Sequence, residues 1–360
     1  MEMKKIFLFF VLSVSIITIK AFEKNTEEKK NCDIVEEGIM MKVAYCDGTG
    51  TSNIKFEERS KPKPSGREIL IDVRASGLNR IDTYMSKGAF GKVDVLGMEV
   101  SGVVSECGDQ VTMYKTGDKV MALLKDGGHA QFVSVDERHA IPISGGLSFE
   151  EAAAIPEQWL TAFQLLFLVG EMKKGDNVLI HAGGSGVGTA AVQLVTLMGG
   201  TAFVTAGSKV KIDNAIKLGA KAGWNYKTED WGKAMEGKAN VILDCVGGSH
   251  APRNIQALAM DSRWVLFGLM GGRDAPGEGL LGTMLRKRAC IRGTTLRTRS
   301  HEYKDVLTSR FEKEIMPLFA SGKLKVVIDS KFNFDKVTDA YDHLLANKNV
   351  GKILIVGIDA

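Results

Sequence analysis

The feature that most constrains this chain is a glycine-rich turn between an apolar run and a helical one. Residues 181–188 read His-Ala-Gly-Gly-Ser-Gly-Val-Gly. They follow the apolar run Asn-Val-Leu-Ile at 177–180 and precede a segment with good helix propensity at 189–195. Glycines at such a turn let the backbone approach a pyrophosphate, which the helix N-terminus attracts. The turn therefore predicts a dinucleotide-binding unit, although Ser185 stands where the usual fingerprint has its second glycine.

The residues after this turn alternate between β-like and helical runs. The β-like runs are 202–205, 223–225, 241–245, 263–267 and 290–295, and the clearest helix between them is 211–218. Repeated strand–helix–strand units predict a parallel, doubly wound sheet. Earlier β-like runs, separated by glycine and proline, predict a small antiparallel barrel. Those runs are 41–45, 68–73, 100–104, 119–123 and 130–135.

The same pattern divides the chain into parts. A chain of 360 residues exceeds the usual size of one domain. Residues 155–297 carry the alternating pattern and are predicted to form a cofactor domain, inserted between the two parts of another domain, 41–154 and 298–360. Residues 22–40 are polar and acidic, as is typical of a linker. The last predicted elements are a helix at 301–319 and β-like runs at 325–328 and 352–356.

The first 21 residues differ in kind from the rest. Lys4 and Lys5 precede fourteen uncharged residues at 6–19, and the bond after Ala21 is a candidate position for cleavage. This pattern predicts a secretory signal at 1–21, hence the secretory pathway, and the apolar stretch is short for a stable membrane span. The alternative is an extra helix or an upstream extension of the reading frame on a cytoplasmic protein. The five cysteines are odd in number and scattered, unlike a disulfide framework.

The charge balance gives little support to a nucleic-acid partner. The chain has 47 basic and 43 acidic residues, a net charge of +4. This excess is too small to predict binding to nucleic acid. The densest basic cluster, 286–288 with Arg292, is short and interrupted by apolar residues, so we interpret it as a solvated or structural patch.

The end of the second strand of the unit indicates which dinucleotide fits. An acidic residue about 20 positions after the first glycine binds the ribose hydroxyls of NAD and repels a 2′-phosphate. Residues 204–211 contain no acid, two hydroxyls and two lysines, and the first acid is Asp213. This favours NADP(H). The alternative is that Lys209 and Lys211 merely begin the next helix, but lysine there opposes the helix dipole.

Further motifs occur in order along the chain. They are 78–82 (Leu-Asn-Arg-Ile-Asp), 97–102 (Gly-Met-Glu-Val-Ser-Gly), 152–157 (Ala-Ala-Ala-Ile-Pro-Glu), 160–162, 205–208, 225–226, 244–248 and 267–272. With the glycine turn, they make the chain resemble the zinc-free, zeta-crystallin-like quinone oxidoreductases of the medium-chain dehydrogenase/reductase superfamily, most of all their tumour-suppressor-inducible branch. The resemblance runs from about Met41 to the C-terminus. It implies a Rossmann domain inserted in a GroES-like β-barrel domain, and a homodimer formed around 290–296.

The resemblance also carries a prediction about metal and reaction. Zinc-dependent members have a histidine where this chain has Met98 and a cysteine where it has Asn79, and they carry a four-cysteine lobe that is missing here. We therefore expect no metal. Without a Lewis acid, reduction of an electron-poor acceptor is easier than alcohol oxidation. The resemblance implies NADPH-dependent reduction of quinones. The alternatives are an enone or alkenal double-bond reductase and a non-catalytic, crystallin-like NADPH-binding protein.

Site roles follow from the resemblance residue by residue. Asn79 corresponds to an asparagine beside the nicotinamide, and Thr161 to a threonine that bonds its carboxamide. Phe90 stands where the family usually has a tyrosine, which removes a hydroxyl near the substrate, and Tyr84 is the candidate substitute. The other predicted cofactor contacts are Gly183, Ser185, Gly186, Val187 and Gly188 at the pyrophosphate, Ser208, Lys211 and Tyr226 at the 2′-phosphate and adenosine, and Leu269, Met270 and Asn349 at the nicotinamide.

Structural interpretations stand beside these roles. Asn79 would cap a turn, Thr161 would be an ordinary helix hydroxyl, and Tyr226 would be a packed surface aromatic. Trp159 and Phe163 are predicted to be core residues rather than substrate contacts. Cys245 has no base near it in the sequence, and we interpret it as structural rather than nucleophilic.

Overall fold

The computed structural model describes residues 39–89, 91, 93–274 and 279–358. From Met40 onward the chain forms one compact unit. The predicted signal-like segment 1–21 lies outside the described residues, as do Phe90 and all but the last two residues of the predicted linker 22–40. Among the residues that are described, none of the helices has the length and apolar character needed to cross a bilayer.

A largely antiparallel sheet combines strands from early and late parts of the chain. Its order is β14-β15-β3-β4-β5-β7, β6 pairs with β3, and only β14 and β15 run parallel to each other. These strands are β3 (Glu68–Gly77), β4 (Glu99–Cys107), β5 (Lys119–Leu123), β6 (Phe132–Asp136), β7 (Ala140–Pro142), β14 (Ile328–Asn333) and β15 (Lys352–Val356). Consecutive residues Ile69, Leu70 and Ile71 are fully buried, so both faces of β3 are covered.

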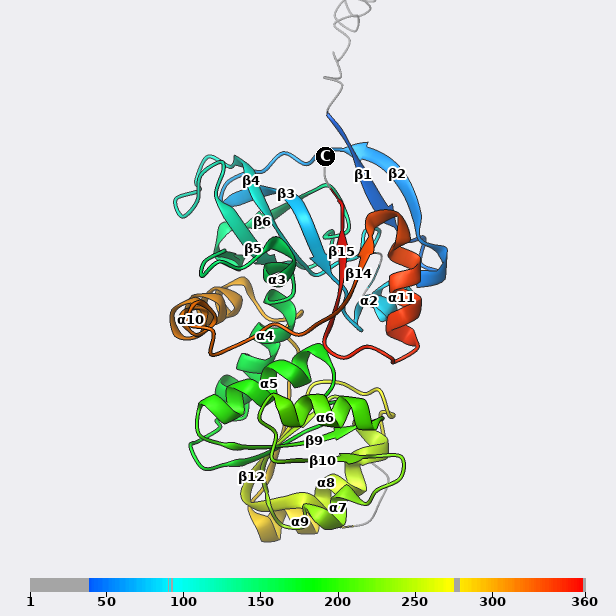
Figure 1. Ribbon diagram of the computed structural model, residues 1–360, viewed down its shortest axis with the longest axis vertical. Coiled ribbons are helices and arrows are strands. Elements are labelled where there is room, and N and C mark those ends of the chain that lie inside the picture. Colours follow the sequence, from blue (N-terminus) through cyan, green and yellow to red (C-terminus); the bar gives the residue numbers. More distant parts are fainter. Residues whose placement is uncertain (1–38, 90, 92, 275–278, 359–360) are drawn as a thin grey trace, which may run out of the picture. The chain divides into compact units, whose positions relative to one another are not determined.

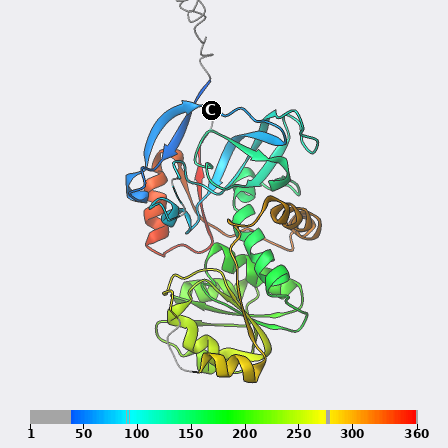
Figure 2. The same ribbon diagram turned by 180° about the vertical axis from the view of Figure 1, so that it is seen from behind.

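Smaller elements surround this sheet. β1 (Met40–Tyr45) pairs with β2 (Lys55–Ser60) in a separate antiparallel ribbon. α3 (Phe149–Ala153) packs on β3 and β4, and α11 (Val337–Leu345) packs on β14 and β15 (Figure 2). The short α2 (Asp82–Met85) follows the end of β3.

The predicted strand at 325–328 was wrong in its position. β14 begins only at Ile328. The reason is a side-chain clamp: Gln193 donates from Nε2 to the Lys325 carbonyl at 3.0 Å and accepts from the Lys325 N–H at 2.9 Å. These bonds hold Lys325 against a helix, and Val326 packs against a hydrophobic core, so the strand begins only at the end of the run.

The middle of the chain forms a second, six-stranded sheet in which every pair is parallel. Its order is β10-β9-β8-β11-β12-β13, so the strand order reverses at β8. The strands are β8 (Asn177–Ile180), β9 (Thr201–Ala206), β10 (Ala222–Asn225), β11 (Ala239–Asp244), β12 (Leu258–Leu266) and β13 (Cys290–Gly293). The predicted fold class is therefore confirmed: a doubly wound parallel sheet accompanies an antiparallel β domain.

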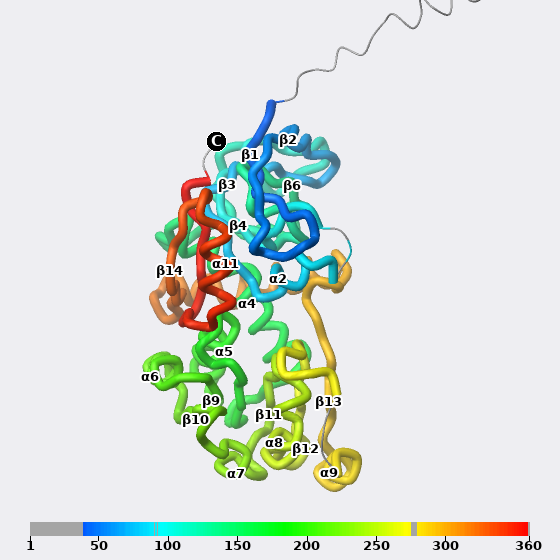
Figure 3. Tube along the Cα trace, turned by 90° about the vertical axis from the view of Figure 1, so that its right-hand side faces the viewer, coloured from blue at the N-terminus to red at the C-terminus, as the bar shows by residue number. Residues whose placement is uncertain are grey.

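Helices cover both faces of the parallel sheet (Figures 1 and 3). α5 and α6 lie on one face, and α7, α8 and α9 lie on the other. They are α5 (Gly186–Leu197), α6 (Lys209–Lys217), α7 (Trp231–Ala234), α8 (Ala251–Ala257) and α9 (Leu280–Lys287). β13 is an edge strand of this sheet and, among the described residues, pairs with β12 alone. The dimer contact predicted for that strand stays a prediction.

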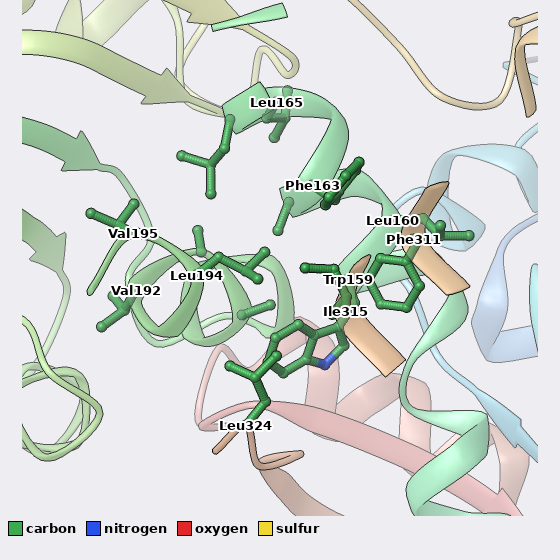
Figure 4. Packing of buried hydrophobic residues seen from close by; sticks show 14 of the residues in the cluster. Trp159, Leu160, Phe163, Leu165, Val192, Leu194, Val195, Phe311, Ile315 and Leu324 are labelled. Atoms are coloured by element: carbon green, nitrogen blue, oxygen red, sulfur yellow. The ribbon is translucent and has the colours of Figure 1, made fainter. Parts of the chain in front are cut away.

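One hydrophobic core lies between the two sheets (Figure 4). α4 (Pro156–Phe163) and the long α10 (His301–Ala320) supply its large aromatic side chains. Trp159 and Phe163 are 1% and 0% exposed, and the rings of Trp159 and Phe319 meet edge to face with centroids 4.7 Å apart. Both are core residues, as predicted.

Candidate active site

The glycine turn joins the end of β8 to the start of α5. Ser185, which interrupts the glycine fingerprint, is the N-cap of α5, and its Oγ accepts a hydrogen bond from the Gly188 N–H at 3.1 Å. Serine is a favourable cap because it satisfies one of the N–H groups that a helix start leaves unpaired. The departure from the fingerprint thus fixes the helix end that would face an anion.

The five predicted pyrophosphate residues divide into two groups. Those that line a cleft are Ser185, Gly186 and Val187. Gly183 and Gly188 do not line it and are needed for packing. A Cβ on Gly183 would lie 2.5 Å from the Val204 Cβ, and one on Gly188 would lie 2.5 Å from the Ala182 carbonyl oxygen. These two glycines let the turn fold tightly, while the other three residues face the cleft.

The cleft has a volume of about 780 Å³ and lies where the glycine turn meets segments of the antiparallel domain. The other predicted site residues that line it are Asn79, Ser208, Lys211, Tyr226, Met270 and Asn349. Thr161 and Leu269 do not line it: Thr161 lies on α4, and its hydroxyl is 3.5 Å from the Glu157 carboxylate. Tyr84, the candidate substitute for the hydroxyl missing at Phe90, does line the cleft.

The cleft is positively charged. Over the described residues its lining contains five basic side chains and no aspartate or glutamate; the basic residues are Arg80, Lys211, Lys227, Arg253 and Lys352. Two have acidic neighbours outside the lining, since Arg253 lies 3.6 Å from Asp230 and Lys352 pairs with Glu99. The remaining three form no ion pair with a described residue, so the cleft attracts anions.

Lys209 and Lys211, the two lysines at the start of α6, have different environments. Lys209 points to solvent and pairs with Asp213 at 2.7 Å. Lys211 lines the cleft, and its Nζ donates to the Asn347 carbonyl at 2.7 Å. Burial and the nearby Arg80 guanidinium lower the pKa of Lys211. Lys211 is therefore the lysine placed to meet a phosphate.

Aromatic and hydroxyl groups complete this end of the cleft. Tyr226 lies over the turn after β9: a Cβ on Gly207 would be 2.9 Å from the Tyr226 hydroxyl. Its ring centroid is 5.6 Å from that of His250, whose pKa burial lowers to about 4. Ser208 is the N-cap residue of α6, but its side chain makes no cap hydrogen bond. This end therefore offers a hydroxyl, an aromatic face and an uncharged imidazole.

A late segment of the chain closes over the glycine turn. The Gly351 N–H donates to the Gly184 carbonyl at 2.9 Å, and Asn349 Nδ2 donates to the Gly351 carbonyl at 2.9 Å. Arg80 holds the same segment through hydrogen bonds to Asn347 and the Leu344 carbonyl. Asn349 thus lines the cleft and also stabilises the segment that forms its wall.

The opposite end of the cleft rests on a buried polar cluster. Asn79 donates from Nδ2 to Glu99 Oε1 at 2.9 Å and accepts at Oδ1 from Lys352 Nζ at 2.7 Å. Lys352 also forms an ion pair with Glu99, and these two side chains are 3% and 0% exposed. Both ends of the Asn79 amide are thus committed to the cluster, and Asn79 does more than cap a turn.

Two further carboxyl groups join this cluster. The Asn79 N–H donates to Asp82 Oδ2 at 2.8 Å, and the Glu157 N–H donates to Glu99 Oε2 at 2.8 Å. The pKa of Asp82 and that of Glu157 are each raised to about 7, by burial above all and, for Glu157, also by the Glu99 charge. The Lys352 ammonium pairs directly with Glu99 alone, and burial favours protonation of Asp82 and Glu157.

Replacing Glu157 by glutamine tests this electrostatic arrangement. In the folded protein the Glu157 carboxyl holds its proton from its ordinary pKa of 4.5 up to about 7, whereas the unfolded chain releases it. Stability therefore falls as pH rises through that window, by up to roughly 3 kcal/mol from this group. We expect Glu157→Gln to match the wild type near pH 5 and to be the more stable protein at pH 8.

Urea unfolding at both pH values measures this difference. The Asp82 carboxyl remains in both proteins, so the difference between them reports the Glu157 carboxyl together with its coupling to Asp82. Unfolding curves that shift equally with pH in both proteins would contradict the assignment.

A second buried network supports the strand ends beneath the turn. His181 makes 2.8 Å hydrogen bonds to Thr205 Oγ1 and Asn254 Oδ1. Asn254 and the Trp264 indole both donate to Asp244 Oδ2, at 2.9 and 2.8 Å. The other carboxylate oxygen of Asp244, Oδ1, accepts hydrogen bonds from two backbone N–H groups of the following loop. In that loop, burial raises the pKa of the Cys245 thiol to about 12, which agrees with a structural cysteine.

Sequence reasoning missed the cluster of Asp82, Glu99, Glu157 and Lys352. A local signal exists for two of them. Glu99 stands between Met98 and Val100 in an apolar strand, and Lys352 directly precedes Ile-Leu-Ile-Val. A charge inside an apolar run signals a buried, paired group. Among the described residues, no group of three or more His, Cys, Asp or Glu side chains is placed to hold a metal ion.

Two family models match the chain. The model described as zinc-binding dehydrogenase matches residues 218–355, and that described as alcohol dehydrogenase GroES-like domain matches residues 65–164. The synaptic vesicle membrane protein VAT-1 homolog of Homo sapiens is 30% identical over 332 residues, which cover 85% of this chain and 84% of the relative. The quinone oxidoreductase of Rattus norvegicus is 25% identical over 309 residues, which cover 82% of this chain and 91% of the relative.

Solved structures match most of the chain. The human synaptic vesicle membrane protein VAT-1 homolog-like protein superposes with a TM-score of 0.78 at 27% identity, covering 90% of this chain and all of the other. The Escherichia coli quinone oxidoreductase complexed with NADPH superposes with a TM-score of 0.78 at 26% identity, covering 88% and 99%.

Proposed function

This chain belongs to the medium-chain dehydrogenase/reductase superfamily, and from that premise we propose that it uses NADPH to reduce quinones or related conjugated carbonyl compounds without zinc. The observation that carries the proposal is the cleft at the glycine turn, lined by five basic and no acidic side chains over the described residues. A parallel sheet binds its nucleotide at the point where strand order reverses, and the turn after β8 is that point.

The residues of the cleft fit this cofactor. Gly184 and Gly186 expose their backbone at the start of α5, where the helix N-terminus favours a pyrophosphate. Neither position has room for a side chain: a Cβ on Gly184 would lie 2.8 Å from Lys211, and one on Gly186 would overlap Gln158. Ser208 and Lys211 would hold a 2′-phosphate, and no carboxylate lines this end to repel it. The cofactor proposed here is therefore NADPH rather than NADH.

The residues at the other end of the cleft would orient an acceptor. Bound NADPH supplies a hydride. Leu78, Met270 and Ile353 give apolar walls that exclude water, and Tyr84 contributes a hydroxyl. Reduction of a quinone gives a phenolate-like anion, which water protonates readily because a phenol has a pKa of about 10. The chain then has to hold donor and acceptor together in the correct orientation.

The decrease of NADPH absorbance with a panel of acceptors tests this function. We expect turnover with benzoquinones and naphthoquinones, slower turnover with enones, and a preference for NADPH over NADH. Dialysis against a chelator should leave the rate unchanged. Tight NADPH binding without oxidation by any acceptor would contradict the enzyme and favour a binding protein. Faster enone than quinone reduction would favour the double-bond reductase, and activity restored by zinc after chelation would contradict the metal-free proposal.

A further inference from the structure

The wall of the cleft holds a buried cation with an unused hydrogen-bond donor. Lys352 is 3% exposed, lines the cleft, pairs with Glu99 and donates to Asn79 Oδ1 at 2.7 Å. An ammonium has three N–H donors. Two are used in these contacts, and the third meets no partner in the described part of the chain. That donor is available to a ligand in the cleft.

The neighbouring side chains leave this role to Lys352. Asn79 uses Oδ1 for Lys352 and Nδ2 for Glu99 and, at 3.5 Å, for the Gly77 carbonyl. Glu99 is fully buried and does not line the cleft. At this position the cluster therefore presents an ammonium N–H to the cleft rather than an amide.

The fold is built to hold this ammonium. Gly77 leaves the space for it: a Cβ there would lie 2.6 Å from Lys352 Cε and 2.5 Å from Glu99 Oε1. The backbone of Lys352 is fixed by its N–H, which donates to the Val327 carbonyl at 2.8 Å. The ion pair with Glu99 and the hydrogen bond to Asn79 fix the position of the ammonium. A charge fixed in a dry site acts on a reacting group without the cost of reorganising solvent.

We propose that the Lys352 ammonium is the electrophile of this site and stabilises the oxyanion that forms when the acceptor takes up the hydride. The inference rests on the proposed function. A C–H bond of the dihydronicotinamide breaks, its hydride forms a new bond at the far end of the conjugated acceptor, and the π electrons of the acceptor move onto the carbonyl oxygen while NADPH becomes NADP⁺. The Lys352 N–H hydrogen-bonds that oxygen, which then takes a proton from water. The ammonium thus supplies the charge stabilisation that a Lewis-acid metal supplies in other enzymes.

Two variants separate this role from a structural one. Lys352→Met removes the charge at similar length but leaves the buried Glu99 carboxylate unpaired, which destabilises a protein. The double variant Glu99→Gln/Lys352→Met removes both charges and protects the fold. In single-turnover hydride transfer we expect both variants to be slower by about 100-fold, as when an oxyanion donor is removed, with NADPH affinity within about threefold of the wild type.

The choice of acceptors gives a signature that a structural defect lacks. Electron-poor quinones stabilise their own anion, so the variants should reduce them with the smallest loss of rate. Acceptors whose product anions are more basic should show the largest loss of rate. The rate should therefore depend more steeply on the reduction potential of the acceptor in the variants than in the wild type. Equal losses for every acceptor, unchanged rates, recovery of rate in the double variant, or a loss confined to NADPH affinity would each overturn the inference.

A binding experiment reports on Lys352 without turnover. 4-Nitrophenol is added to the protein saturated with NADP⁺, and its phenolate absorption band shows which form is bound. We expect the wild type to bind the phenolate in preference to the phenol, and Lys352→Met to lose that preference by about tenfold or more, one pKa unit. Phenolate preference without quinone turnover would support the inference while contradicting the proposed function; equal preference in both proteins would overturn the inference.

Discussion

The substitution Gly188→Ala should reduce NADPH affinity by at least about 100-fold and destabilise the fold by about 1–3 kcal/mol, the cost of overpacking. The added Cβ of Gly188 would lie 2.5 Å from the Ala182 carbonyl oxygen and 2.8 Å from the Gly183 Cα. These are backbone atoms, which cannot rotate away. The turn itself must therefore move, and the N–H groups at the start of α5 move with it.

Gly293→Ala is the matched control for this substitution. Gly293 ends β13 in the same sheet, and a Cβ there would meet no atom within 4 Å. Fluorescence titration with NADPH and thermal unfolding of both variants give the comparison. Equal behaviour of the two variants would show that the turn tolerates displacement and that its geometry does not determine affinity.

The second large effect is expected at Lys211. Its removal by Lys211→Ala should weaken NADPH binding by roughly 10- to 100-fold, since a hydrogen bond to a charged group contributes about 1.5–3 kcal/mol. NADH affinity should change little, because NADH lacks the 2′-phosphate. The matched control is Lys209→Ala, which removes a lysine two positions away that is 85% exposed and paired with Asp213.

Titration of all three proteins with both cofactors distinguishes two roles for Lys211. Its Nζ also bonds the Asn347 carbonyl, so its loss could loosen the wall of the cleft. In that case the affinities for NADPH and NADH would fall together. Equal affinity of the wild type for the two cofactors would contradict the inference from the acid-free strand end at 204–211.

Much of the fold was predictable because its signals are local. The strand at 177–180, the turn after it and the following helix depend on neighbours within a few residues. The strand predicted at 325–328 failed because Gln193, far away in the sequence, competes for its backbone. No periodicity in the run itself records that competition.

The candidate site was predictable only in part, for the same reason. Ser208, Lys211 and Tyr226 follow strand ends of one sheet, where topology brings them together. The pairing of Lys352 with Glu99 joins β15 to β4 across the antiparallel domain, and nothing near either residue specifies the other. Their roles emerge only when distant strands pair.

The contact between Gly351 and Gly184 has a consequence for the biosynthesis of the protein. A ribosome completes the glycine turn long before it adds the segment that lies on it. Residues 349–353 include four residues of the cleft wall, and the residues of β15 that pair with β3 follow them. A nascent chain that stops short of these residues can fold its parallel sheet but lacks one wall of the nucleotide cleft. Nucleotide retention by stalled chains of increasing length should therefore appear late, in one step.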